Sequence, residues 1–143
     1  MKRIFYLLLF LIPLLVFSQQ PASDLDPDAG DGSEYTFWVK LNAFMEGPIK
    51  GANMKTDLNK GGHIPLLQPY NVPPWNYDGP ESVDTIPNGN IVDWVYVELR
   101  NATDPSIATD TTAFAWKAAF ILNTGQVVDL DGSSMLEFDT TFT

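Results

Sequence analysis

The 143-residue chain contains no cysteine and a single histidine, His63. Without cysteine there are no disulfides and no thiolate chemistry. Transition-metal sites need clusters of His and Cys, and hydrolysis by a Ser-His-Asp triad would have to use His63 itself. The sequence also has neither a nucleophile-elbow pattern nor a phosphate-binding glycine loop. These absences argue against an ordinary metabolic enzyme.

Positive charge is also scarce. Eight Lys and Arg stand against 18 Asp and Glu, which gives a formal net charge of −10. Such a field repels phosphate backbones, so we expect no nucleic-acid partner, and anionic membranes are disfavoured for the same reason. A cation such as calcium is the partner that this charge would attract. No cofactor other than calcium is expected.

The only long hydrophobic run lies at the N-terminus. Lys2 and Arg3 precede residues 4–17, which carry no charge, and Val16 and Ser18 are small enough for a cleavage site. This three-part pattern predicts a secretory signal over residues 1–18. The run is shorter than the about 20 residues of a membrane span, so we expect no membrane span after cleavage. Cleavage would lower the basic residues from 8 to 6 and take the net charge from −10 to −12.

Residues 19–33 are rich in Asp, Gly, Pro and Ser and show no apolar period. They are predicted to be a flexible acidic leader. The alternating acids of residues 24–30 are similar to a calcium loop but miss the EF-hand spacing, so a linker is the simpler interpretation. The remaining residues, 34–143, suit one domain.

Alternation of apolar and polar residues predicts strands over residues 34–45, 91–99, 111–122, 126–130 and 135–138. In the second of these, Ile91 and Asp93 would share a face with Val95, Val97 and Leu99. Turns at residues 123–125 and 131–132 predict that the last three strands form an antiparallel meander. No sustained helical period occurs, so we predict an all-β, antiparallel β-sandwich with a long Pro- and aromatic-rich loop. Its last strand, residues 135–142, would keep one unpaired edge.

Residues 47–90 contain most of the prolines, which do not fit a central strand. Long connections of this kind are often functional. Aromatic rings beside amide side chains suit stacking on sugar faces and hydrogen bonding to hydroxyls, and they also suit peptides. The candidate ligand-binding residues are Tyr70, Asn71, Trp75, Asn76 and Tyr77. The alternative is that these rings fold back over a sheet edge and complete the core.

Paired acids suggest two further candidate sites. Glycoside hydrolysis needs two carboxylates that converge, whereas Asp93 and Glu98 are predicted on opposite faces of one strand. A half-buried Asp93 would then accept backbone N–H bonds from the preceding turn. Asp129 and Asp131 are candidate calcium ligands, although Asp-Gly is also common turn chemistry.

Several segments together resemble a domain of secreted and surface proteins of Bacteroidetes. They include Gln68-Pro69-Tyr70-Asn71, Pro74-Trp75-Asn76-Tyr77 and Val92-Asp93-Trp94-Val95, and the motifs are specific as a set. Further matching segments are residues 46–48, 53–54, 56–59, 64–66, 81–83, 86–88, 97–100, 119–122 and 127–132. The resemblance covers about Tyr35 to Phe138. It implies surface display or secretion rather than a reaction, because members are often labelled hemagglutinin or adhesin and exported by the type IX system.

The resemblance departs at the C-terminus, where family members continue through a further strand, an Asp/Gly repeat and a sorting tail. The chain is therefore expected to be a fragment or a shortened member. The combined hypothesis is a secreted or cell-surface, non-catalytic module that binds a glycan or a surface protein, periplasmic if the chain is complete. The alternatives are a secreted carbohydrate-active hydrolase and a structural spacer of a larger adhesin.

Overall fold

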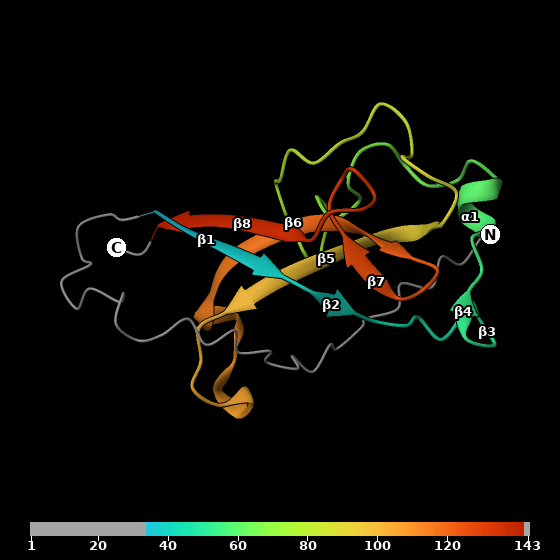
Figure 1. Cartoon of the computed structure of the whole chain (residues 1–143). Coiled ribbons are helices and arrows are strands. Elements are labelled where there is room, and N and C mark those ends of the chain that lie inside the picture. The colour runs from blue at the N-terminus through green and yellow to red at the C-terminus, as the bar shows by residue number, and fades with distance from the viewer. Residues whose placement is uncertain (1–33, 142–143) are drawn as a thin grey trace.

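The structure is a computed structural model that describes residues 34–141. The predicted signal and leader lie outside the described residues. Along the chain the elements are β1 (Glu34–Val39), β2 (Leu41–Asn42), β3 (Ile49–Lys50), β4 (Asn53–Met54), α1 (Asp57–Lys60), β5 (Ile91–Arg100), the 3₁₀ turns Pro105–Ile107 and Asp110–Thr112, β6 (Ala113–Leu122), β7 (Gln126–Val128) and β8 (Leu136–Thr141) (Figure 1).

The main sheet has four antiparallel strands in the order β2-β7-β6-β5. Its two long strands, β5 and β6, pair from Ile91 with Leu122 to Arg100 with Ala113. β1 continues directly into β2, so the two are pieces of one bent strand. The first piece pairs with β8 and the second with β7. The sheet therefore curls into a half-barrel, with the β1–β8 ribbon crossing over β5 and β6 (Figure 1).

The predicted meander is wrong in its last step. β6 and β7 do pair, but β8 pairs with β1 instead of β7. The reason is that β2 and β6 already occupy the two edges of β7. Residues 129–135 therefore carry the chain away to the free edge of β1. As predicted, β8 keeps one edge that pairs with no strand in the described part of the chain.

A β-bulge at the start of β5 corrects the predicted faces of that strand. The register shifts between Ile91 and Asp93, so Val92 is an extra residue on the bulged strand. Ile91 consequently packs with Trp94 on the outer face, and Val92 packs with Val97 on the inner face. Asp93 pairs with Ile121 and stays on the inner side, as its alternation with Val95 predicts.

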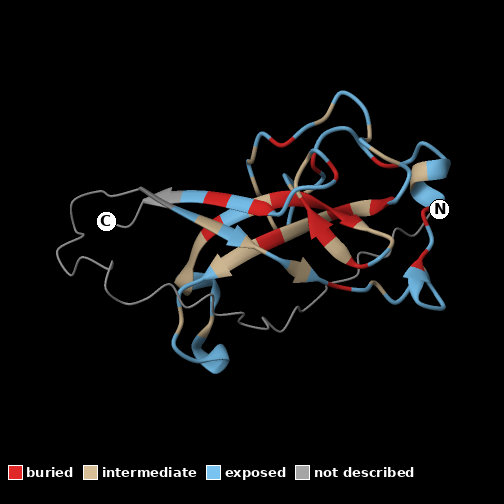
Figure 2. Ribbon diagram, in the orientation of Figure 1, coloured by how far each residue is buried: buried red, intermediate tan, exposed pale blue. Residues whose placement is uncertain are grey.

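Two cores lie on opposite faces of the sheet. The inner core joins Val97 and Ala119 of the sheet to Leu136 and Phe138 of β8. The outer core lies between the sheet and the segment from residue 64 to residue 86, with Phe120 completely buried. Figure 2 shows the buried positions gathered along β5, β6 and β7. Both faces of the central strands are therefore covered, which explains why they carry apolar residues at consecutive positions.

A mostly β, antiparallel fold is thus confirmed, with few helical residues in the described part. The finer description as a β-sandwich stays a prediction. Within residues 34–141, no helix is long and apolar enough to cross a bilayer.

Candidate binding site

The Pro- and aromatic-rich loop is built as an irregular hairpin. Leu67 forms a β-bridge with Ser82. Gln68 N donates to Glu81 O at 3.0 Å, and Val83 N donates to Leu66 O at 2.9 Å. These backbone bonds hold the two ends of the loop together, so that residues 69–80 form its closed tip.

Gln68 organises that tip from inside, with only 2 % of its surface exposed. Its Nε2 donates to Tyr77 O and to Gly79 O, both at 3.1 Å. Its Oε1 accepts from Tyr70 N at 2.6 Å. One side chain therefore satisfies three backbone groups that have no strand to pair with, which is how a loop rich in proline can be ordered.

Two of the five predicted site residues lie mainly against the sheet. The Tyr70 and Tyr77 rings approach Tyr96 of β5, with centroids 5.5 and 5.1 Å away. Burial raises the pKa of Tyr70 and of Tyr77 above the usual value, and it raises that of Tyr96 to about 12. For these two residues the structure agrees with the alternative interpretation, in which loop aromatics complete a core.

The other three predicted residues lie nearer the surface. Trp75 is half-buried and packs edge-to-face on Tyr70, with centroids 5.3 Å apart. Asn71 and Asn76 are exposed. The structure thus places an aromatic ring and two amides at the tip, on the outer side of the packed tyrosines.

Trp116 of β6 is a further candidate site residue, which was not predicted from the sequence. It is 44 % exposed, and its Nε1 donates to Glu98 Oε2 at 3.2 Å. Tyr77 Oη lies 3.3 Å from the Trp116 carbonyl oxygen, which places the two residues side by side. We call the five neighbouring residues Trp75, Tyr70, Tyr96, Tyr77 and Trp116 the aromatic strip. The sequence signal that could have identified Trp116 is a Trp next to a charged residue, Lys117, within the predicted strand 111–122.

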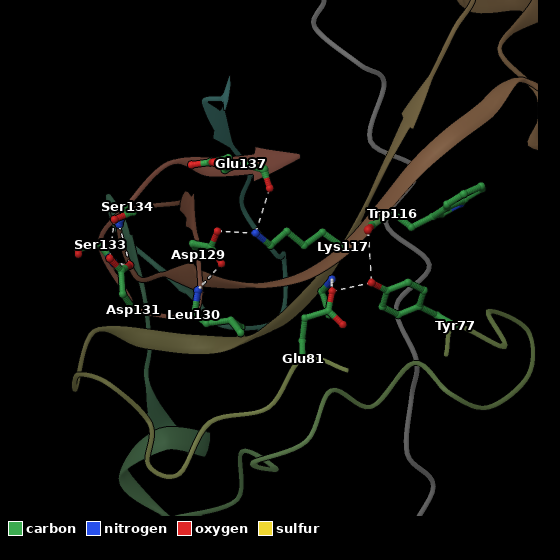
Figure 3. A network of polar contacts seen from close by, with 11 residues as sticks. Tyr77, Glu81, Trp116, Lys117, Asp129, Leu130, Asp131, Ser133, Ser134 and Glu137 are labelled. Atoms are coloured by element: carbon green, nitrogen blue, oxygen red, sulfur yellow. Dashed lines mark hydrogen bonds and ion pairs between the residues drawn. The ribbon is translucent and has the colours of Figure 1, made fainter. Parts of the chain in front are cut away.

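Glu81 was also missed. Only 8 % of its surface is exposed. Its Oε1 accepts from Tyr77 Oη at 2.5 Å and from Ala118 N at 3.2 Å, while Oε2 is buried without a hydrogen-bond partner among the described residues. Figure 3 shows the Glu81 carboxylate beside the Tyr77 hydroxyl, next to the strand that carries Trp116 and Lys117. A Glu that follows Gly79 and Pro80 in a loop carries no sequence signal of burial.

The two acids considered for hydrolysis do not converge. Asp93 lies level with Ile121, whereas Glu98 lies opposite Trp116, and these positions are on opposite faces of the sheet. Asp93 Oδ1 accepts from Trp94 N at 2.8 Å, and Trp94 is the next residue of β5, not part of the preceding turn from which the backbone bond was expected. Glu98 forms an ion pair with Arg100. Burial raises the pKa of Asp93.

Asp129 and Asp131 are each engaged by their own surroundings. Asp129 Oδ2 pairs with Lys117 Nζ at 2.5 Å. Asp131 accepts from Ser133 N, Ser134 N and the Ser134 hydroxyl (Figure 3). These bonds, led by the hydroxyl, lower the pKa of Asp131 to about 2. No group of three potential metal ligands occurs in residues 34–141. The loop geometry is that of an Asx-type turn, and calcium binding stays a prediction.

No protein-family model, curated protein or solved structure matches the chain. The resemblance to surface proteins of Bacteroidetes therefore stays a prediction.

Proposed function

We propose that the chain is an exported, non-catalytic β module that binds a glycan through the aromatic strip. Export rests on the predicted signal at residues 1–18. We infer from this signal that the module is secreted or displayed on the cell surface. A surface protein is the second class of ligand that the sequence predicted.

One observation carries the proposal: rings from the loop and from the sheet meet on one face. Ring contacts join Trp75 at the loop tip to Tyr70, Tyr70 to Tyr96, and Tyr96 to Tyr77. The Tyr77 hydroxyl then reaches the backbone carbonyl of Trp116 on β6. A row of fixed rings loses little side-chain entropy when a ligand stacks on it. Exposed amides beside Trp75 supply donors and acceptors for hydroxyl groups.

Trp116 is the best anchor on this strip. Nearly half of its surface is exposed, and the bond from its Nε1 to Glu98 holds the indole in place. Glu98 is in turn paired with Arg100, which also donates to Ala108 O and Asp110 Oδ1. The ring is therefore oriented before a ligand arrives.

The β-sandwich is the finer part of the proposed architecture. We infer that the β1–β8 ribbon serves as the second layer, packed on the inner face of the main sheet. Phe37 of β1 and Phe138 of β8 belong to the same core as Val97 and Ala119 of the sheet, which supports this arrangement. The outer face then remains for the loop and its ligand.

Affinity electrophoresis of the exported protein tests the proposal. Gels would contain a soluble β-glucan, α-glucan, xylan or mannan. We expect at least one polymer to retard the protein. Trp116→Ala should weaken that binding about two- to tenfold, which corresponds to the loss of about 0.5–1.5 kcal/mol for one ring contact. Trp38→Ala is the matched control, because Trp38 is a second exposed tryptophan, 64 % exposed, on β1, a strand that contributes no residue to the strip.

Three results would contradict the proposal. If no polymer retards the protein, even with polymer binding sites at millimolar concentration in the gel, and the melting temperature is normal, the structural spacer is favoured. Equal loss in Trp116→Ala and Trp38→Ala would place binding elsewhere. Release of reducing sugar from a retained polymer would establish the hydrolase instead. Trp75→Ala probes the other end of the strip, but it also removes the contact with Tyr70, so its affinity must be compared with its melting temperature.

A further inference from the structure

Positive charge is almost absent from the part of the chain that forms the aromatic strip. Residues 61–116 contain all five strip residues, and they carry one Arg and no Lys. The same stretch carries seven acids, at positions 78, 81, 84, 93, 98, 104 and 110. Four lysines lie between residues 40 and 60, a segment that contributes no residue to the strip. The strip is therefore built from the most acidic part of an acidic chain.

The two other basic residues of the described chain are already engaged by carboxylates. Arg100 pairs with Glu98 and, at 2.7 Å, with Asp110, so this group of three charges is negative in sum. Lys117 pairs with Asp129 at 2.5 Å. Neither cation is free to bind a carboxylate or sulfate group of a ligand.

One carboxylate lies at the edge of the exposed tryptophan. Glu98 is opposite Trp116 in the pairing of β5 with β6, and its Oε2 accepts from the indole Nε1 at 3.2 Å. The Glu98 side chain keeps 21 % of its surface exposed, so it can still face a ligand that stacks on the ring. The face of a Trp ring attracts a cation by itself. Glu98 adds a second attraction of the same kind.

The tyrosine hydroxyls of the strip respond to the same negative charge. Burial raises the pKa of Tyr96 most, and the charge of Glu98 raises it further, by more than Arg100 lowers it. Burial also raises the pKa of Tyr70, and the charge of Asp93 adds to that effect. Carboxylates thus oppose the formation of negative charge at two points along the strip.

A negative potential along a row of rings distinguishes sugars by their charge. A neutral sugar stacks on the rings without a net electrostatic gain. A uronate or sulfate group would meet carboxylates of its own sign and no free cation. A free amino group, protonated to ammonium, would be attracted both by the carboxylates and by the ring faces. N-acetylation of that amino group removes its charge.

We propose that the strip selects glycans with free amino groups, namely polymers of unacetylated glucosamine, and excludes glycans of acidic sugars. This selectivity rests on the proposed glycan binding by the strip and adds the charge of the ligand to it. An ammonium group lies over Trp116 with Glu98 beside it, and further sugars of the chain stack toward Trp75.

Calorimetric titration of the exported protein with matched hexasaccharides tests this selectivity. The probes share one β-1,4-linked backbone: cellohexaose, the glucosamine hexamer, the N-acetylglucosamine hexamer and cellohexaose oxidised to the uronate at C6. At about pH 6 and about 50 mM salt, the glucosamine hexamer should bind about tenfold more tightly than cellohexaose. The N-acetylated hexamer should bind like cellohexaose, and the uronate should not bind.

The ratio of the affinities for the glucosamine hexamer and for cellohexaose is the readout for variants. It cancels any change in the orientation of the Trp116 ring, which affects both ligands. Glu98→Gln should lower the ratio about threefold. Asp57→Asn removes the same charge at an exposed position of α1 and should leave the ratio unchanged. Salt at about 0.5 M should bring the ratio close to one while cellohexaose still binds.

Four results would overturn the selectivity. They are equal affinity for the two hexamers, measurable binding of the uronate, no binding of the glucosamine hexamer, and glucosamine binding that survives Trp116→Ala unchanged. The last would show a general attraction to the net charge of −10. Glycan binding itself fails separately, when no neutral polymer retards the protein in the gels, so the two failures can be distinguished.

Discussion

Asp93 shows how a single residue can oppose stability at neutral pH. Its carboxylate is half-buried at the bulge of β5, and burial raises its pKa. The folded protein therefore holds this proton more tightly than the unfolded chain does. The contribution of Asp93 to stability is favourable below the pKa of the unfolded chain, about 3.9. It is lost as the pH rises through the pKa of the folded protein. At pH 7 the ionised side chain costs free energy.

We expect Asp93→Asn to raise the melting temperature at pH 7 and to change it little at pH 3. The Asn Oδ1 can still accept from Trp94 N, so the bulge should remain intact. Scanning calorimetry at the two pH values measures the effect. Asp84→Asn, at an exposed loop position, is the control and should change neither value. A stabilisation of equal size at both pH values would mean that charge burial is not the cause.

Individual side chains were the hardest part to predict from sequence. The aromatic residues of the loop could be identified by type, but their division into packed Tyr70 and Tyr77 and more superficial Trp75 depends on where Tyr96 lies. Glu81 is buried because the loop closes on β6, a contact between residues 37 positions apart. The pattern of apolar and polar residues in a short stretch of sequence carries no information about such a long-range contact.

At the scale of elements, the loop depends on Gln68 more than on any strand. Its side chain bonds to three backbone groups inside the tip. Gln68→Ala would leave these groups unsatisfied, at about 1–3 kcal/mol for each that water cannot reach. We expect the tip to open locally, with the amide of Tyr70 losing its protection from hydrogen exchange while β5 and β6 keep theirs.

Exchange followed by mass spectrometry or NMR would show this local opening. Asn71→Ala is the matched control, since Asn71 is exposed in the same tip. It should leave the exchange of Tyr70 unchanged. If both variants exchange alike, or if Gln68→Ala unfolds the whole domain at once, the tip does not behave as a separate unit.

Strands were predictable where alternation is strong, and pairing was not. The segments of β5, β6 and β7 lie within about two residues of their predicted bounds. The first strand was predicted whole but bends into β1 and β2. Residues 54–58 lie in the long Pro-rich connection, for which no element was predicted, and they contain the end of β4 and the start of α1. β8 pairs with β1 because β2 and β6 already occupy both edges of β7, and this depends on the topology of the whole sheet.

For the whole molecule, the outer core joins the loop to the sheet through tyrosines that resist ionisation. Burial raises the pKa of Tyr70, Tyr77 and Tyr96, the last to about 12. For Tyr77, the hydrogen bond to Glu81 adds to this effect. The unfolded chain loses these protons near pH 10. The contribution of these three tyrosines to the free energy of unfolding is therefore fully present below about pH 10. It falls as the pH rises from about 10 through the pKa values of the folded protein.

We expect the domain to unfold cooperatively above about pH 11, with tyrosinate absorbance at 295 nm from the three rings appearing together with the loss of far-UV circular dichroism. Tyr96→Phe keeps the ring on Tyr70 and Tyr77 and removes one ionisable group, so its alkaline midpoint should lie at higher pH. The melting temperature at pH 7 should change little, because no hydrogen bond of the Tyr96 hydroxyl occurs among the described residues. Ionisation of all three rings near pH 10 without unfolding would show that the loop leaves the sheet freely and that the aromatic strip is not preformed.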